Sequence, residues 1–292
     1  MLNKKKILVL VIAYNDQEFI LNVLEKIKKK LNFKKSEILI INDNSQDKTF
    51  EKIYEFIKKN KKIAEKIKLV ENPKNKGYGK NQKMGYLYSI INKFDVVVMV
   101  HGDGQFGPEK IDEIIKPILN KKADAVLGSR MSKKIEALKG NMPMYKFIGN
   151  IFLTYLQNLI LGSKLTEFHT GYRAYSPKSL KRIPFLYNSN SFPFDTEILI
   201  QLILNNFKIS EISIKATYST QISNLKVIPY GFSVLNAAVL GKLTKVGIIN
   251  NKKYNQKFND ILVKKKIILE LKKGINFSKK KMIKLCNSQK PN

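Results

Sequence analysis

The sequence predicts an α/β fold with a mostly parallel central sheet flanked by helices. Short runs rich in Val and Ile alternate with helical segments along the first 130 residues. These runs are almost continuously apolar, as in residues 94–100, which indicates strands covered on both faces. Polar, glycine-containing segments follow the runs, at the position where open α/β sheets bind ligands. We therefore expect a ligand site at the carboxyl edge of a parallel sheet.

The expected elements alternate regularly in the first half of the chain. Apolar residues at helical spacing, such as Ile20, Leu24 and Ile27, separate one expected strand from the next. Strands are predicted at residues 6–13, 37–42, 66–70, 94–100 and 123–128. Helices are predicted over residues 17–31, 47–60, part of 72–92, and 108–120.

The pattern changes after residue 130. An apolar helix is predicted over 143–162, a polar loop over 166–176, helices near 177–182 and 195–206, and a strand over 209–217. The chain becomes rich in lysine towards its end. We expect a catalytic domain over 1–220 and a basic, mainly helical extension over 221–292.

Composition restricts the partners. Fifty-four Lys and Arg against 23 Asp and Glu give a formal net charge of +31, which favours nucleotides, nucleic acid or an anionic membrane surface. A compositional bias of the genome explains part of the lysine content equally well. The one cysteine, Cys286, excludes a disulfide framework and indicates a reducing, cytoplasmic setting. No apolar run reaches about 18 residues, so no transmembrane helix is expected.

Two short polar segments follow the first two expected strands. The first contains Tyr14, Asn15 and Asp16, and the second contains Asp43 and Ser45. Such side chains can hydrogen-bond a base and a ribose at the edge of a sheet. Taken singly, each segment is explained better by ordinary turn chemistry.

A glycine-bearing loop precedes the helix expected within residues 72–92. Gly79 and Lys80 lie where a loop before a helix N-terminus can hold an anion. The loop matches neither the GxxxxGK[ST] phosphate loop nor the GxGxxG dinucleotide fingerprint. It is therefore a weak signal when considered alone.

The strand over 94–100 leads directly into His101-Gly102-Asp103-Gly104-Gln105. Asp103 is a candidate ligand for a divalent cation, which a diphosphate leaving group requires. His101 is an acceptable ligand for Mn²⁺ or Zn²⁺ and a poorer one for Mg²⁺. We therefore expect a metal site here.

Two of the three arginines lie in motif-like segments. Arg130 follows Gly128-Ser129, and Arg173 ends a segment that contains Glu167 and His169. Arginine binds phosphate through two parallel hydrogen bonds, which lysine cannot reproduce. Glu167 and His169 are candidates for abstracting a proton from an acceptor hydroxyl. A structural Arg–Glu pair is the alternative.

The order of these segments resembles that of the family 2 glycosyltransferases, which have the GT-A fold, and within them the dolichol/polyprenyl-phosphate sugar transferases. The similarity extends from about residue 6 to about residue 218. His101 stands where these proteins usually have the first Asp of the metal segment, and Glu167 stands where they usually have Asp. The seven matching segments are 14–16, 42–45, 75–85, 101–105, 128–130, 166–173 and 194–197.

The resemblance implies an inverting transfer from a UDP- or GDP-sugar to a polyprenyl phosphate or a membrane-associated glycan. It assigns nucleotide binding to the segments around Asp16 and Asp43, and to the loop that contains Gly79 and Lys80. It assigns a divalent cation, Mn²⁺ or Mg²⁺, to Asp103 with His101.

The resemblance also implies contacts to the phosphates and the sugar. Arg173 and Arg130 would bear phosphate charge, with Gln105, Asp195 and Glu197 nearby. Asp195 and Glu197 also suit the start of a helix, where acidic side chains complement the helix dipole. A lipid phosphate needs no general base, whereas a sugar hydroxyl would require Glu167 or His169.

A lipid acceptor implies contact with a membrane. The 143–162 helix suits the interface, and the basic extension would add attraction to anionic headgroups, which predicts a peripheral protein on the cytoplasmic face. The alternatives are that the 143–162 helix is a lid over the core and that the basic extension is a disordered tail. A sugar-1-phosphate nucleotidyltransferase and a non-catalytic nucleic-acid-binding protein are the competing functions, although no specific nucleic-acid motif is present.

Overall fold

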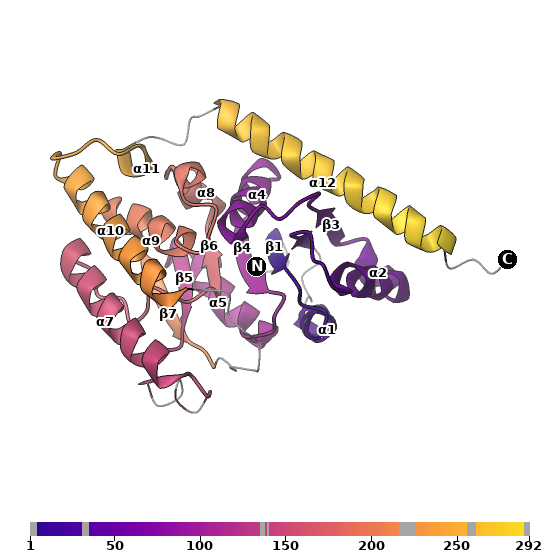
Figure 1. Ribbon diagram of the computed structural model, residues 1–292, viewed down its shortest axis with the longest axis horizontal. Helices are drawn as coiled ribbons and strands as arrows, with labels where there is room; N and C mark the ends of the chain where they lie inside the picture. The colour runs from indigo at the N-terminus through magenta and orange to yellow at the C-terminus, as the bar shows by residue number, and fades with distance from the viewer. Residues whose placement is uncertain are drawn as a thin grey trace.

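The computed structural model describes residues 5–30, 35–134, 138, 140–215, 226–255 and 261–288. Its centre is a seven-stranded sheet with the order β3-β2-β1-β4-β6-β5-β7 (Figure 1). Every strand pair is parallel except those of β6, which runs antiparallel to β4 and β5. The predicted α/β architecture with a mostly parallel sheet is confirmed.

The strands lie close to the predicted positions. All seven residues of β1 are buried, as expected for a strand covered on both faces. The strands are β1 (Ile7–Ala13), β2 (Ser36–Asn42), β3 (Ile67–Glu71), β4 (Val96–His101), β5 (Ala125–Ser129), β6 (Arg173–Tyr175) and β7 (Ile209–Ser213).

Helices cover both faces of the sheet. One apolar cluster joins alternate residues of the central strands to α1, α2 and α5, and the other joins the intervening residues to α4, α9 and the C-terminal helices. The helices of the first part are α1 (Ile20–Lys30), α2 (Thr49–Lys59), α3 (Lys61–Ala64), α4 (Tyr78–Ile91), η2 (Pro108–Lys110), α5 (Ile111–Leu119) and α7 (Met144–Leu161). Those of the second part are α8 (Pro177–Leu180), η3 (Phe185–Tyr187), α9 (Phe194–Leu204), α10 (Val227–Lys245), α11 (Lys252–Asn255) and α12 (Ile261–Ser288).

Strand β6 corrects the prediction of a loop over 166–176. Its three residues insert between β4 and β5 in the middle of the sheet, and all three are buried. The segment is too short, and Arg173 too polar, to show the apolar pattern of a strand. Its pairing comes from the two neighbouring strands, which the local sequence does not reveal.

The C-terminal residues form long helices, as predicted. Helix α10 packs against α7 and α9, and α12 crosses the edge strand β3 and α4 (Figure 1). The hydroxyl of Ser278 donates to the carbonyl of Leu69 at 2.7 Å. Ile267 and Leu271 of α12 belong to the same apolar cluster as Leu39 of β2. These helices therefore complete the core.

Helix α10 bears on the expectation that the chain has no transmembrane helix. In the described part of the chain it is the one helix long and apolar enough to cross a membrane by length and composition alone. A third of its most apolar window is buried inside the protein. The segment was overlooked because Pro229, Gly231 and Asn236 interrupt its apolar residues. Length and composition of one such helix are weak evidence of a span.

Candidate active site

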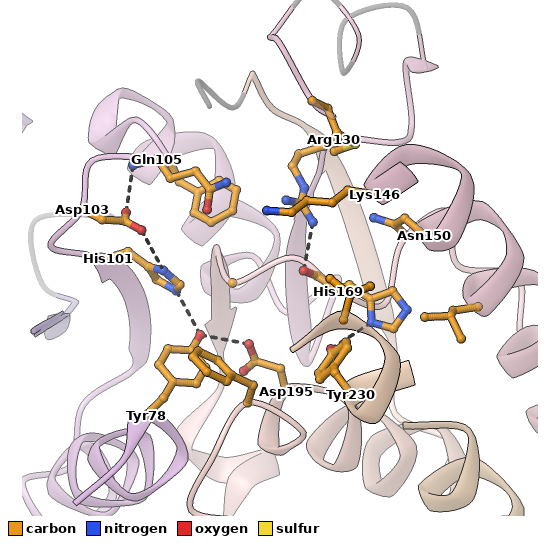
Figure 2. Close-up of a pocket in the computed structure, with 17 residues that line it drawn as sticks. Tyr78, His101, Asp103, Gln105, Arg130, Lys146, Asn150, His169, Asp195 and Tyr230 are labelled. Carbon is orange, nitrogen blue, oxygen red and sulfur yellow. Dashed lines mark hydrogen bonds and ion pairs between the residues drawn. The ribbon is translucent and has the colours of Figure 1, made fainter. Parts of the chain in front are cut away.

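A cavity of about 250 Å³ lies at the carboxyl edge of the sheet, beside α7 and α10 (Figure 2). The two sides of the cavity differ. His101, Asp103 and Tyr78 lie on one side, and Arg130, Lys146 and His169 lie on the other (Figure 2). The sequence-predicted residues that line the cavity are His101, Asp103, Gln105, Arg130, His169 and Asp195.

A chain of hydrogen bonds crosses the first side. Nε2 of His101 lies 2.9 Å from the hydroxyl of Tyr78, which donates to Oδ2 of Asp195 at 2.9 Å. The amide of Gln82 donates to Oδ1 of Asp195 at 2.8 Å. Burial and the nearby Asp195 charge raise the pKa of Tyr78 well above its usual value, so this hydroxyl keeps its proton. The imidazole of His101 is thus held from one side.

Asp103 faces the free side of that imidazole. Its Oδ2 lies 4.0 Å from Nδ1 of His101, and its Oδ1 accepts the Gln105 N–H at 2.9 Å. Among the described residues, no group of three His, Cys, Asp or Glu side chains is close enough to hold a metal. A cation at this position would therefore need ligands from a substrate as well, such as diphosphate oxygens.

Asp16 lies next to this pair, at the end of β1. Its Oδ2 accepts the Tyr14 N–H at 3.0 Å and touches the backbone at Gly102, where a Cβ atom would collide with it. Burial and the charge of Asp103 raise the pKa of Asp16 to about 8. Two carboxylates thus repel one another beside the cavity, and a bound cation would relieve this repulsion.

The other predicted nucleotide residues form a network at the ends of β1, β2 and β3. The N–H of Asn15 donates to Oγ of Ser45 at 2.9 Å, and that hydroxyl donates to Oδ1 of Asn42 at 2.5 Å. The amide of Asn42 in turn donates to Glu71 at 2.6 Å. Tyr14 and Asn15 remain exposed. The network fixes the strand ends beside the cavity, and its contact with a nucleotide stays a prediction.

Asp43 anchors the glycine-bearing loop. Its Oδ1 accepts the Lys76 N–H at 2.8 Å and the Asn72 amide at 2.7 Å, and its Oδ2 accepts the Gly77 N–H at 2.9 Å. The carboxylate is 2% exposed. Asp43 therefore orders the loop that precedes α4, and its direct contact with a nucleotide stays a prediction.

Gly79 and Lys80 lie outside the cavity. Gly79 packs against the carbonyl oxygens of Ser189 and Ser191, so closely that a Cβ atom would not fit. The ammonium group of Lys80 lies 3.1 Å from Glu270 of α12, which also binds Lys76. In this structure the glycine therefore allows close packing of two loops, and the lysine joins α4 to α12.

The second side of the cavity carries two cations from different elements. The backbone N–H and Nε of Arg130 donate to Glu167 at 2.7 and 2.8 Å, and Asn150 donates to the same carboxylate at 2.9 Å. Lys146, one turn before Asn150 on α7, also lines the cavity (Figure 2). Partial burial and the charge of Arg130 lower the pKa of Lys146. Because the two positive charges face the same space, an anion would stabilise both.

Glu167 is fully buried and does not line the cavity. Burial acts to raise its pKa, but the charge and hydrogen bonds of Arg130 and the hydrogen bond of Asn150 keep the pKa below its usual value. The carboxylate thus holds Arg130 in place. The structural Arg–Glu pair, considered as the alternative from the sequence, is present.

His169 lines the cavity as a neutral imidazole. Burial lowers its pKa to about 3. Its Nδ1 lies 3.0 Å from the hydroxyl of Tyr230 on α10, and its Nε2 is buried without a hydrogen-bond partner among the described residues. His169 therefore offers one nitrogen to a ligand in the cavity.

Arg173 and Glu197 are turned into the protein instead. The guanidinium of Arg173 is fully buried and donates to the carbonyls of Thr170 at 2.6 Å and Phe168 at 2.7 Å, so it holds the loop that carries His169. Glu197 accepts the Ser189 N–H and pairs with Lys253 of α11. Neither side chain lines the cavity.

Tyr78, Tyr230 and Lys146 are among the cavity residues that sequence reasoning missed. Tyr78 lies between two glycines, and these glycines indicated an anion site made by the backbone, not a role for the tyrosine side chain. Tyr230 lies in the extension, where no motif was recognised. Lys146 did leave a signal, because it is the one charged residue in an otherwise uncharged helix of 18 residues.

The sheet order and the site at its carboxyl edge define a GT-A-like glycosyltransferase fold. The family model for glycosyl transferase family 2 matches residues 8–184, and the chain belongs to this family. The predicted fold, family and enzyme class are thereby confirmed.

Two relatives and one solved structure show the extent of the similarity. An uncharacterised protein of Methanocaldococcus jannaschii is 30% identical over 83% of this chain and 94% of its own. The UDP-N-acetylglucosamine–dolichyl-phosphate N-acetylglucosaminyltransferase of Methanococcus voltae is 28% identical over 83% of this chain and 98% of its own. Glucosyl-3-phosphoglycerate synthase of Mycobacterium tuberculosis, solved with Mn²⁺, UDP and phosphoglyceric acid, has a TM-score of 0.57 at 15% identity over 85% of this chain and 80% of its own. That structure shares the fold. None of these findings supports a nucleotidyltransferase or a nucleic-acid-binding protein.

Proposed function

We propose that this glycosyltransferase moves a sugar from a nucleotide diphosphate donor to a polyprenyl phosphate at a membrane surface. The observation that carries the proposal is the cavity with two unlike sides. Carboxylates and His101 lie on one side, and Arg130 and Lys146 lie on the other, next to an exposed apolar helix face. The dolichyl-phosphate transferase named above supports the choice of acceptor.

The donor would bind on the side of Asp103. The nucleotide would lie over the ends of β1 and β2, near Asp16, Asp43 and Ser45, with its diphosphate towards Asp103 and His101. A divalent cation bound there would neutralise the charge that develops on the leaving diphosphate. These residues fit a divalent cation, because the imidazole of His101 and the carboxylate of Asp103 face the same space.

The acceptor phosphate would bind between Arg130 and Lys146. Its oxygen is already anionic, so it can attack the anomeric carbon without a general base. Glu167 would keep Arg130 oriented, and the buried Asn150 would hold that carboxylate from α7. One displacement at the anomeric carbon inverts its configuration, as the resemblance predicts.

The apolar face of α7 supports a membrane location. Asn150, Thr154 and Gln157 of this helix face the protein interior and are buried. The opposite face is more than half exposed and carries Tyr145, Ile148, Phe152, Tyr155 and Leu159. A helix with polar residues inside and large apolar residues outside is the reverse of an ordinary surface helix. Such a face indicates contact with an apolar environment.

Helix α10 extends the same surface. Ile228 and Phe232 are each 73% exposed, and α10 lies beside α7 at the end of the molecule away from α12 (Figure 1). Residues of both helices line the cavity. A lipid chain lying along this surface would thus deliver its phosphate to Arg130 and Lys146. The net charge of +31 favours an anionic leaflet, such as the cytoplasmic face.

The test is a transfer assay with labelled UDP- and GDP-sugars and a short polyprenyl phosphate in vesicles containing anionic lipid. We expect a labelled lipid product that depends on Mn²⁺ or Mg²⁺. Labelled product on a soluble glycan alone, or on no acceptor with any donor, would overturn the proposed acceptor. The unmodified vesicles without polyprenyl phosphate are the matched control.

A further inference from the structure

Helix α12 is seated on the edge strand β3 in one position (Figure 1). Gly274 lies so close to this strand that a Cβ atom on it would collide with the side chain of Val70. One turn later, the hydroxyl of Ser278 donates to the carbonyl of Leu69 at 2.7 Å. An edge strand has backbone groups without a strand partner, and this hydrogen bond satisfies one of them. Close packing and a hydrogen bond therefore fix where α12 lies along β3.

Lys281 of α12 reaches into the network at the strand ends. Its Nζ lies 3.1 Å from Oε1 of Glu71, and the other oxygen of that carboxylate accepts the amide of Asn42 at 2.6 Å. Glu71 is 1% exposed. Burial raises the pKa of Glu71, and the hydrogen bond of Asn42 and the charge of Lys281 act against this rise. Loss of the Lys281 charge would leave a buried carboxylate without its cation, which is strongly unfavourable.

The network connects this ion pair to the surface over which the nucleotide would lie. Oδ1 of Asn42 accepts the hydroxyl of Ser45, which in turn accepts the N–H of Asn15, two residues after the end of β1. Because Asn42 accepts on one side and donates to Glu71 on the other, only one orientation of its amide satisfies both neighbours. A change at Glu71 would thus disturb Asn42 and, through it, Ser45 and the exposed Asn15.

Glu270 of the same helix holds the glycine-bearing loop. Its carboxylate lies 3.2 Å from the ammonium group of Lys76 and 3.1 Å from that of Lys80. Lys76 is fixed a second time, because its N–H donates to Asp43 just after β2. Burial acts to raise the pKa of Glu270, but the two lysines keep it below its usual value. The loop between β3 and α4 is therefore held between Asp43 and α12.

Completion of the core accounts for only part of α12. Ile267 and Leu271 join the apolar cluster of the sheet, as an ordinary packing helix does. Glu270 and Lys281 instead form ion pairs at the two groups of residues over which the nucleotide is proposed to bind. A buried ion pair often adds less to stability than apolar packing of similar volume. The positions that these pairs fix explain them better than stability does.

We propose that α12 positions the nucleotide site, with Lys281 and Glu270 as its positioning residues. The proposal rests on the proposed function, because it takes the nucleotide to lie over the ends of β1 and β2. It gives a role in donor binding to a helix outside residues 8–184, which match the family model. Neither residue touches the nucleotide in this arrangement. Lys281 holds the strand ends beside it, and Glu270 holds the loop.

The test measures the Kd of UDP and of GDP for the full chain with Mn²⁺ by isothermal titration calorimetry. We expect Lys281→Met to raise the Kd of the nucleotide that binds about 3- to 30-fold, and Glu270→Gln to raise it in the same range. Lys281→Arg keeps the charge and should recover most of the affinity. A role in stability alone would lower the number of binding sites, because less protein is folded, and would leave the Kd unchanged.

The matched control is Lys280→Met. Lys280 is adjacent to Lys281 and exposed, so this substitution makes the same change of charge on the same helix. The variant should bind nucleotide as the unmodified protein does. Equal Kd values in Lys280→Met and Lys281→Met, no recovery in Lys281→Arg, or unchanged or tighter binding in Glu270→Gln would overturn the inference. Tighter binding would show that Glu270 competes with the diphosphate for the lysines of the loop.

These outcomes are separate from the transfer assay. Sugar transfer with the same donor KM in Lys281→Met and Lys280→Met would leave the proposed function intact and remove the role of α12. A raised Kd in Lys281→Met without transfer to polyprenyl phosphate would leave the role of α12 intact and remove the proposed reaction. Absence of UDP and GDP binding by the unmodified protein would remove both.

Discussion

The two sides of the cavity are built in different ways. The donor side consists of strand ends whose side chains are tied to one another, from Asn15 through Ser45 and Asn42 to Glu71. The acceptor side consists of helices α7 and α10, which expose large apolar residues and present Lys146 and Tyr230 to the cavity. A network of this kind fixes the positions of its side chains, whereas an exposed apolar face is typical of a surface that contacts a partner. The difference supports the proposal that a soluble donor binds at a preformed site beside a surface that contacts a membrane.

The largest expected effect is on the donor side. Asp103→Ala removes the carboxylate that would hold the cation, and we expect sugar transfer to fall by about 10²–10³-fold. The metal-dependent stabilisation by nucleotide, measured as a shift in Tm, should disappear as well. Adding EDTA to the unmodified protein should have the same effect, and transfer that persists in either case would contradict the donor side as described.

The acceptor side is tested by Lys146→Met, which keeps an apolar stem but removes the charge. We expect the KM for polyprenyl phosphate to rise about 10- to 100-fold, because a charged hydrogen bond is lost. The KM for the nucleotide sugar should stay unchanged. Lys242→Met, on an exposed position of α10, is the control. A rise confined to the donor KM would reverse the assignment of the two sides.

The membrane contact is tested by Phe152→Glu on the exposed face of α7. A charge in place of an inserted aromatic ring should lower the affinity for anionic vesicles by about tenfold. Leu262→Glu on α12 makes the same kind of change at a residue that is 78% exposed, on the other part of the molecule. Sedimentation with vesicles measures both variants. Equal loss of binding in the two would show that α7 and α10 are not the membrane-facing surface.

The smallest effect concerns stability and pH. The pKa of Asp16 rises on folding from about 3.8 to about 8, because of burial and the Asp103 charge. The folded state therefore holds more protons than the unfolded state in this interval, and stability is lost as the pH rises through it. In metal-free protein, Asp16→Asn should remove that loss and raise Tm at pH 8 by a few degrees, with little change near pH 4. A constant difference between pH 4 and pH 9 would show that the carboxyl is not perturbed.

Much of the fold was predictable because local patterns determine it. Runs such as Ile7–Ala13 are apolar throughout, and β-branched residues favour strands. The end of each run also locates the carboxyl edge of the sheet, and Asp103 and Arg130, which follow two such runs, both line the cavity there. Strand β6 was missed because a three-residue strand has no pattern. The apolar character of α10 was overlooked because this helix mixes small, polar and apolar residues.

The site was predictable in its members but not in their roles. Glu167 and His169 are separated by one residue, yet only His169 lines the cavity. Arg173 was expected to meet phosphate, and its guanidinium instead supports the backbone of the loop before β6. Which way each side chain points depends on contacts from elements distant in the chain.

The sequence by itself determined the alternating elements, the family and the positions of Asp103 and His101, since these depend on short-range patterns and residue chemistry. Only the tertiary structure decided which nitrogen of His101 faces Asp103, because that choice depends on Tyr78 and on Asp195, which is 117 residues beyond Tyr78. It also decided that α7 turns its polar face inward, where the amide of Asn150 donates to the buried carboxylate of Glu167 that pairs with Arg130.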